Sequence, residues 1–223
     1  MSSSASNEKI RTTSTHRRAL ERAVKARGTF AVIVGPDGVG KTTLAKEILR
    51  LWPGPKGYFH FLPTRRHPII PAPQEISRIR PKPPRSGNRP LGWLRMIRNL
   101  IRFWWAYLTQ IRPLVRSGAL VIGDRWCYGY TGQPYSLRFY GPEGLARIFQ
   151  HLFPSPDLLI DLKAPVDVIA SRKSELTRDE IGEEMVRWSQ VEAGRRIELF
   201  ATEEPRAVAE ETVRFLRSLV SEY

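Results

Sequence analysis

The chain has 223 residues, of which 36 are Lys or Arg and 22 are Asp or Glu, so its formal net charge is +14. A chain of this length forms one α/β domain, or one domain with a modest insertion. The charge indicates anionic partners, such as nucleotides, nucleic acid or an anionic membrane surface.

The single cysteine, Cys127, excludes an intrachain disulfide framework, and we expect it to be a small buried residue. No apolar run is long enough to span a membrane, and the polar N-terminus lacks the apolar core of a secretory signal. We therefore expect a cytoplasmic protein that is at most peripheral to a membrane.

The N-terminal residues are predicted to contribute little to the core. Residues 1–13 are polar, and we expect them to form a disordered tail. A helix is predicted from Ser14 or Thr15 to Arg27, and Gly28 ends it. Since no internal repeat and no second core is evident, residues 14–223 are predicted to form a single domain.

Residues 35–43, GPDGVGKTT, match the pattern G-x-x-x-x-G-K-[ST]. They follow an apolar run, Thr29–Val34, that is typical of a buried parallel strand, and they precede a helical pattern that ends at Leu51. Glycines in this context bring backbone N–H groups close to phosphate oxygens at a helix N-terminus. We predict a phosphate-binding loop for ATP and Mg2+, formed by Gly35, Asp37, Gly38, Val39, Gly40, Lys41, Thr42 and Thr43.

Within this loop, Lys41 is expected to reach the β- and γ-phosphates, and the Thr42 hydroxyl to hold Mg2+. A second strand is predicted over residues 57–62, and a long irregular segment rich in proline and arginine follows over residues 63–90. Ligands bind at the carboxyl ends of strands in open parallel sheets. Arg65 and Arg66 are therefore candidates for binding an acceptor's phosphate, although a solvated turn explains them equally well.

A long helix is predicted from Leu91 to Gly118, with a bend at Pro113. Between Arg78 and Arg116 there are ten Lys or Arg residues and no Asp or Glu. Such a segment can lie on an anionic membrane surface, or it can be a core helix whose arginines face an anionic substrate or water. Its apolar face is predicted to contain Leu94, Ile97, Leu100, Ile101, Trp104, Leu108 and Ile111, and its basic stripe Arg95, Arg98 and Arg102.

A third strand, residues 119–122, leads into Asp124 and Arg125. An Asp at the end of a parallel strand beside a phosphate loop is placed to bind Mg2+ or its waters, although turns also favour Asp. The following stretch, residues 126–142, is rich in aromatic residues and glycine. Tyr130 and Gln133 are candidates for lining a pocket for a base or sugar, and an ordinary hydrophobic loop is the alternative.

The remaining pattern alternates strands and helices, which specifies a parallel sheet with helices on both faces. A mixed-charge segment is expected over residues 172–180. Strands are predicted at 157–162 and 196–201, and helices at 143–152, 165–171, 182–195 and 205–222.

Three pieces in this order resemble the thymidylate kinase family of nucleoside monophosphate kinases. They are the phosphate loop, the Asp124-Arg125-aromatic motif, and Pro156-Asp157-Leu158-x-Ile160-Asp161-Leu162. The resemblance runs from about residue 29 to the end of the chain. It implies a P-loop kinase fold with a central five-stranded parallel sheet, and an arginine-bearing lid at about residues 172–184 that closes over ATP.

By position, the resemblance implies that Asp37 contacts the acceptor's sugar, that Asp124 acts through the metal or its waters, and that Arg125 orients the acceptor phosphate. In that family a catalytic arginine comes from the phosphate loop or from the lid. Since this loop carries Gly38 and Val39, the lid must supply the cation. The candidates are Arg172, Lys173 and Arg178.

The sequence departs from the family on the acceptor side. The Arg-Glu-Pro-Gly signature after the second strand is replaced by residues 63–67, PTRRH. The Asp-Arg pair of the long helix is replaced at Ile101, Arg102 and Phe103, so Arg102 becomes a candidate for binding substrate. The ATP half of the site resembles the family, whereas the residues of the acceptor half differ from it.

Two functions follow from these observations. The first is an ATP-dependent phosphotransferase acting on a small acceptor, with a phosphate or a hydroxyl as the receiving group; for a hydroxyl, Asp124 or Asp37 would be the base. The second is a nucleotide-regulated binding protein that uses residues 78–116 on nucleic acid or an anionic membrane. We rank the second below the first, and nucleic acid below the other partners. A homodimer is left open.

Overall fold

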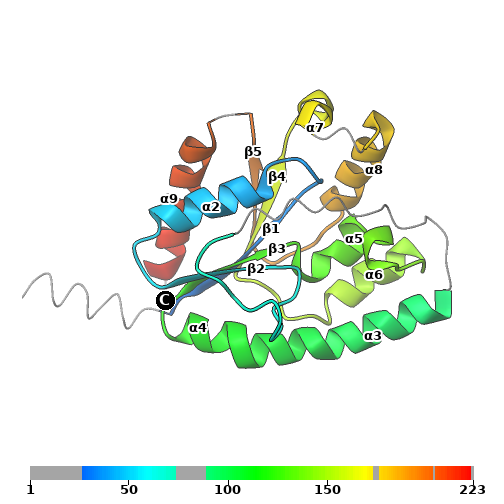
Figure 1. The fold of residues 1–223 in the computed structure, drawn as a ribbon, viewed down its shortest axis with the longest axis horizontal. Coiled ribbons are helices and arrows are strands. Elements are labelled where there is room, and N and C mark those ends of the chain that lie inside the picture. The colour runs from blue at the N-terminus through cyan, green and yellow to red at the C-terminus, as the bar shows by residue number, and fades with distance from the viewer. Residues whose placement is uncertain (1–26, 74–88, 173–175, 203, 222–223) are drawn as a thin grey trace, which may run out of the picture.

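Five parallel strands form one sheet in the computed structural model, in the order β2-β3-β1-β4-β5 (Figure 1). The structure describes residues 27–73, 89–172, 176–202 and 204–221. The predicted tail and the helix before Arg27 lie outside these residues. The strands are β1 (Thr29–Val34), β2 (Lys56–His60), β3 (Leu120–Asp124), β4 (Leu158–Lys163) and β5 (Arg196–Phe200).

Helices cover both faces of the sheet, as the alternating pattern predicts. The α-helices are α2 (Lys41–Leu51), α3 (Arg89–Ala106), α4 (Arg112–Arg116), α5 (Gly129–Gly132), α6 (Glu143–Gln150), α7 (Val166–Arg172), α8 (Arg178–Ser189) and α9 (Pro205–Ser221). A π-helical turn over Tyr107–Ile111 joins α3 to α4, and short 3-10 helices lie at Trp126–Tyr128 and Tyr135–Leu137.

The central strand β1 is buried along its whole length because both of its faces are covered. Ala31 and Ile33 enter the core that α2, α7 and α9 cover. Phe30, Val32 and Val34 enter the second core, which α3, α4, α5 and α6 cover. Successive side chains of a strand point to opposite faces, so one apolar run supplies two cores.

The strand order places the ends of β1, β2 and β3 side by side. From β1 the chain goes first to β2 and β3 on one side, and then to β4 and β5 on the other. In the sheet register Asp124 lies opposite Ile33 of β1 and opposite His60 of β2. Ligand sites in open parallel sheets lie at such a reversal of strand order.

The long helix is irregular one turn before Pro113, whereas the sequence predicts a bend at the proline itself. The backbone N–H of Arg112 reaches the carbonyl of Tyr107, five residues back, which defines the π-helical turn. A proline lacks an N–H, and its ring clashes with the carbonyl four residues earlier, so the preceding turn widens.

Helix α8 begins at Arg178, four residues before its predicted start, and it ends at Ser189. Thr177 caps it: its hydroxyl accepts from the Glu180 backbone N–H at 3.3 Å, and the Glu180 carboxylate accepts from the Thr177 N–H at 2.9 Å. This reciprocal pair is a capping box. The last three residues of the predicted mixed-charge segment, 178–180, are therefore the first turn of a helix.

Most of the apolar face predicted on the long helix is exposed to solvent. Ile111 of the predicted set is buried and Leu100 is partly buried, whereas Met96, Phe103 and Ala106 form the rest of the buried face. No helix among the described residues is long and apolar enough to cross a membrane.

Candidate active site at the phosphate loop

The phosphate loop between β1 and α2 has the backbone that its glycines predict. Gly35, Gly38 and Gly40 have φ angles of 138°, 90° and 108°, values that other residues rarely adopt. A Cβ atom at Gly35 would lie 2.4 Å from the carbonyl oxygen of Leu162, so this position also requires the absence of a side chain.

Lys41 is buried, and its ammonium lies inside the loop. It donates to the carbonyl oxygens of Gly35 at 2.9 Å and Pro36 at 2.7 Å, and it lies 3.6 Å from Asp37 Oδ1. Burial and the nearby Arg125 guanidinium lower the pKa of Lys41, against the opposing effect of Asp37 and other carboxylates. The ammonium therefore lies where the loop would enclose a phosphate.

Asp124 ends β3 beside this loop, and its two carboxylate oxygens have different surroundings. Oδ2 accepts from the Tyr58 hydroxyl at 3.2 Å and lies 3.1 Å from Nδ1 of His60. Oδ1 is buried without a hydrogen-bond partner. Burial acts to raise the pKa of Asp124, but Arg125, His60 and Lys41 outweigh it and lower the pKa to about 2. The carboxylate is therefore ionised and has one oxygen free for a cation.

These residues fit a magnesium ion held together with a nucleotide. Mg2+ binds oxygen ligands and usually takes one or two carboxylates plus substrate phosphates. The Tyr58 hydroxyl donates to Asp124 Oδ2, and the Thr42 side chain is near enough to that hydroxyl to act on its pKa, so the two predicted Mg2+ ligands lie close to one another. In the part of the chain that the structure describes, no three His, Cys, Asp or Glu side chains gather into a metal site of their own.

Arg125 is held by its backbone and by its charge partners. Its φ angle is 69° and that of Trp126 is 47°, an uncommon conformation that is often found at functional sites. The Arg125 guanidinium binds Asp37 Oδ1, and its Nη1 lies 3.0 Å from Nε2 of His60. Burial alone would lower its pKa, but Asp124 and Asp37 outweigh burial and raise it.

His60 lies between Asp124 and Arg125, and sequence reasoning treated it only as part of a strand. A guanidinium can only donate hydrogen bonds, so Nε2 of His60 must accept from Arg125. Nδ1 then carries the proton and donates it to Asp124 Oδ2. The imidazole therefore connects an anion and a cation and fixes their relative positions. No sequence motif indicates His60, because Asp124 lies 64 residues away in the sequence.

Glu184 on α8 is a second residue that sequence reasoning missed. Its Oε2 accepts from the backbone N–H of Asp37 at 3.3 Å and from Nε2 of Gln133 at 3.1 Å. Burial, and then the charge of Asp37, raise the pKa of Glu184. Nothing in the sequence distinguishes it from its neighbour Glu183. Gln133, predicted to bind substrate, uses its amide here to connect Glu184 to the loop after β3.

The aromatic stretch after Arg125 belongs in large part to the second core. Trp126, Cys127, Tyr128 and Tyr130 are all at most 3 % exposed, and the Tyr130 hydroxyl accepts from Nδ2 of Asn99 at 2.8 Å. The structure therefore does not bring the Tyr130 ring to the site, and the alternative of an ordinary hydrophobic segment explains it. Cys127 is buried as expected, and burial raises the pKa of its thiol.

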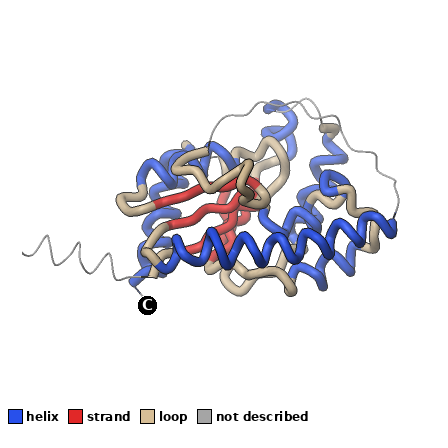
Figure 2. The backbone as a smooth tube through the Cα atoms, turned by 60° about the horizontal axis from the view of Figure 1, so that its bottom comes forward, coloured by secondary structure: helices blue, strands red, loops and turns tan. Residues whose placement is uncertain are grey.

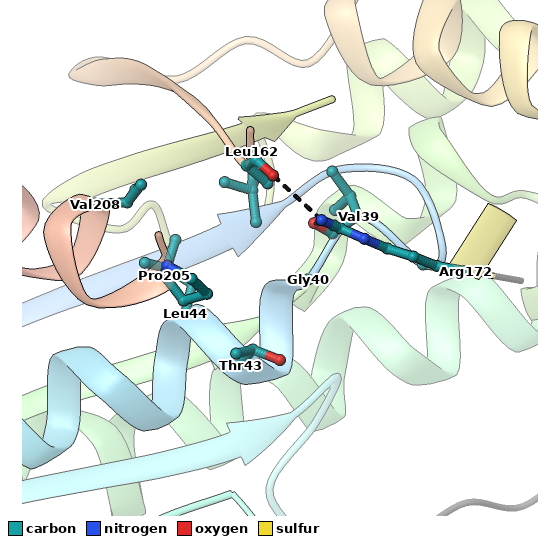
Figure 3. A pocket seen from close by; sticks show the side chains of 10 residues that line it. Val39, Gly40, Thr43, Leu44, Leu162, Arg172, Pro205 and Val208 are labelled. Carbon is teal, nitrogen blue, oxygen red and sulfur yellow. Dashed lines mark hydrogen bonds between the residues drawn. The ribbon is translucent and has the colours of Figure 1, made fainter. Parts of the chain in front are cut away.

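A cavity of about 240 Å³ lies outside the phosphate loop (Figure 3). Arg172, at the end of α7, reaches across it: Nη1 lies 3.4 Å from the carbonyl oxygen of Val39, and Nη2 3.4 Å from that of Ala201. Thr43 lines the same cavity. Of the other lid candidates, Arg178 pairs with Asp167 at 2.9 Å on the surface, and Lys173 lies outside the described residues.

Three predicted substrate-binding arginines are exposed. Arg65 and Arg66 lie in a turn that Thr64 and His67 close with two backbone hydrogen bonds. Nη1 of Arg102, on α3, lies 3.4 Å from Oδ1 of Asn99. The role of all three in binding an acceptor stays a prediction.

The comparison with solved structures concerns the fold. No protein-family model matches the chain, and no curated protein sequence matches it. The structure is similar to that of thymidylate kinase from Candida albicans, with a TM-score of 0.55 and 17 % identity. The match covers 87 % of this chain and 93 % of that chain. The predicted fold is thereby confirmed: a P-loop α/β fold with a five-stranded parallel sheet flanked by helices.

Proposed function

We propose that this chain is an ATP-dependent kinase that transfers the γ-phosphate of ATP to a small acceptor. One observation carries the proposal. Asp124 has an ionised carboxylate with a free, buried Oδ1, and its Oδ2 accepts from the Tyr58 hydroxyl, which lies near the Thr42 side chain. The charge, the free oxygen and the adjacent hydroxyl are what a nucleotide-bound Mg2+ requires.

The residues divide into two groups around the loop. Beside the cavity at Val39, Arg172 would bind ATP. On the inner side of the loop, where β2 and β3 end, Asp37, Arg125 and His60 would bind the acceptor. Mg2+, when bound, would neutralise charge on the phosphates, while Lys41 and Arg172 would stabilise charge that develops on the transferred group.

The charges of the inner side support a phosphate as the receiving group. A hydroxyl acceptor needs a base whose pKa lies near the working pH. The pKa of Asp124 is about 2 and Asp37 is paired with Arg125, so neither predicted base is suited to take a proton. The carboxylate with a raised pKa, Glu184, has its Oε2 occupied by the Asp37 N–H and by Gln133. Arg125 instead offers a partly buried guanidinium, a group that can bind phosphate in a bidentate manner. A monophosphate of the nucleotide class is therefore the acceptor that we propose.

The test measures ADP release from Mg-ATP with a panel of dTMP, other nucleoside monophosphates, nucleosides and simple sugars. We expect turnover with a monophosphate, and its loss in Lys41→Ala. Lys46→Ala, an exposed lysine of the same helix, is the matched control and should retain activity. Turnover with hydroxyl acceptors alone would overturn the proposed acceptor. Failure to bind Mg-ATP would overturn the proposal that the chain is a kinase.

A further inference from the structure

Helix α3 presents an apolar face to solvent. Among the described residues, twelve large hydrophobic side chains are exposed, and seven of them lie between Leu91 and Leu108. Ile101 is 67 % exposed and Trp105 is 70 % exposed. We call this surface the α3 face, formed by Leu94, Ile97, Ile101, Trp104, Trp105 and Leu108.

The α3 face is separate from the face that packs on the protein. Met96 and Phe103 point into the second core, whereas the α3 face points away from it. In Figure 2 the helix runs across the front of the molecule, and no described element covers it. Soluble monomers seldom expose so many large apolar side chains together, and such a surface marks an interaction site.

The apolar surface continues onto α6 and the residues that follow it. Nε1 of Trp104 donates to the carbonyl oxygen of Leu152 at 2.9 Å, which connects α3 to the end of α6. Leu152 is 50 % exposed, and Ile148, one helical turn earlier, is 63 % exposed. Two elements therefore contribute to one surface, which is broader than a single helical stripe.

The charged residues on the α3 part of this surface are all arginines. Arg98 and Arg102 are exposed on α3, and from Leu91 to Arg116 the chain has five arginines and no Asp or Glu. A two-fold dimer through this face would bring the arginines of one copy toward those of the other, with no acidic residue on the helix to pair with them. The charge instead complements an anionic surface.

We propose that the α3 face binds the surface of an anionic lipid bilayer. Leucine, isoleucine and tryptophan side chains would enter the boundary between headgroups and acyl chains, and Arg98 and Arg102 would contact lipid phosphates. The helix would lie parallel to the membrane plane. In Figure 1, α3 lies on the opposite side of the molecule from α2 and α7, so binding leaves the ATP cavity open.

The test is flotation of the full chain with vesicles of phosphatidylcholine alone, or of phosphatidylcholine and phosphatidylglycerol at about 7:3. We expect binding to the anionic vesicles that weakens at high salt. The double variant Ile101→Ser/Trp105→Ser should lower the partition coefficient at least tenfold. The matched control is Val186→Ser/Phe200→Ser, whose side chains are 59 % and 56 % exposed elsewhere, and it should bind as the unaltered chain does.

A second variant separates charge from apolar contact. Arg98→Gln/Arg102→Gln should weaken binding to anionic vesicles roughly 10- to 30-fold, since each arginine near such a surface contributes about one factor of five. Absence of vesicle binding by the unaltered chain overturns the proposal. So does a dimer that Ile101→Ser/Trp105→Ser converts to monomer, because the face then belongs to a second copy. Nucleic-acid binding that depends on the arginines alone also overturns it. None of these readouts depends on kinase activity.

Discussion

At the scale of single residues, Asp124 lies where two strands and the phosphate loop meet. Its Oδ2 is held by Tyr58 and His60, while Oδ1 is free. Asp124→Asn keeps the shape of the side chain but removes the charge that would bind Mg2+. We expect kcat to fall by about 10^3-fold, measured as ADP release at saturating Mg-ATP. Asp167→Asn, at a carboxylate 73 % exposed, is the control, and a loss below tenfold at Asp124 would contradict the assignment.

The same carboxylate links stability to pH. The pKa of Asp124 falls from 3.8 to about 2 in the folded protein, so the charged form stabilises the fold above pH 4 and this contribution disappears as the pH falls through about 2. We expect the unfolding free energies of the unaltered chain and Asp124→Asn to converge by about 2 kcal/mol between pH 6 and pH 2. Urea denaturation at both pH values measures this. A difference that stays constant would show that the pKa is not lowered.

His60 is expected to act by positioning Arg125. His60→Gln can occupy a similar volume, but it cannot hold the Asp124 carboxylate and the Arg125 guanidinium in the same geometry. We expect KM for the acceptor to rise about tenfold, with KM for ATP unchanged. His67→Gln, exposed in the turn after β2, is the control. Equal changes in both KM values would indicate a general structural defect.

At the scale of elements, the buried strands were the easiest to predict. Continuous β-branched runs, such as Thr29–Val34, have few alternatives to a buried parallel strand, and β1 begins and ends as predicted. The predicted start of α8 is four residues too late, because Thr177 lies within a run of charged residues that hides its role as a capping residue. The exposed side of α3 could not be predicted, because hydrophobic spacing gives the face of a helix but not what covers it.

The capping box of α8 is expected to contribute measurably to stability. Thr177→Ala removes the hydroxyl that accepts from the Glu180 N–H, which costs about 1 kcal/mol. In a domain of this size that corresponds to a fall in Tm of about 2–4 °C, measured by calorimetry or circular dichroism. Ser189→Ala, at the other end of the helix, is the control. An unchanged Tm in Thr177→Ala would mean that water replaces the cap.

At the scale of the whole molecule, the two halves of the site differ in how far the sequence predicts them. The phosphate loop is one contiguous stretch, so its glycines and Lys41 reveal it directly. The proposed acceptor half combines Arg125, which the resemblance indicates, with His60 from β2 and Glu184 from α8, which no motif marks. These residues become neighbours only through strand order and helix packing, which no local pattern encodes.

Binding of Mg-ATP should stabilise the folded chain as a whole. A ligand at 100 times its Kd contributes about 2.7 kcal/mol, or a rise in Tm of about 5–10 °C for this chain length. We expect this rise in thermal-shift measurements with Mg-ATP, a smaller one when EDTA removes the metal, and none in Lys41→Ala. A rise that is identical with and without metal would contradict a role for Thr42 and Asp124 as Mg2+ ligands.

The π-helical turn at Tyr107–Ile111 determines which side of α4 faces the core, relative to α3. Ala106 and Ile111 are five residues apart yet enter the same core, which an α-helix would not allow. One residue fewer would rotate α4 by about 100° relative to α3, so that Val115 and the α3 face could not both keep their present directions. A single inserted residue thus lets one continuous helix close the core with its last part while its first part turns an apolar side outward.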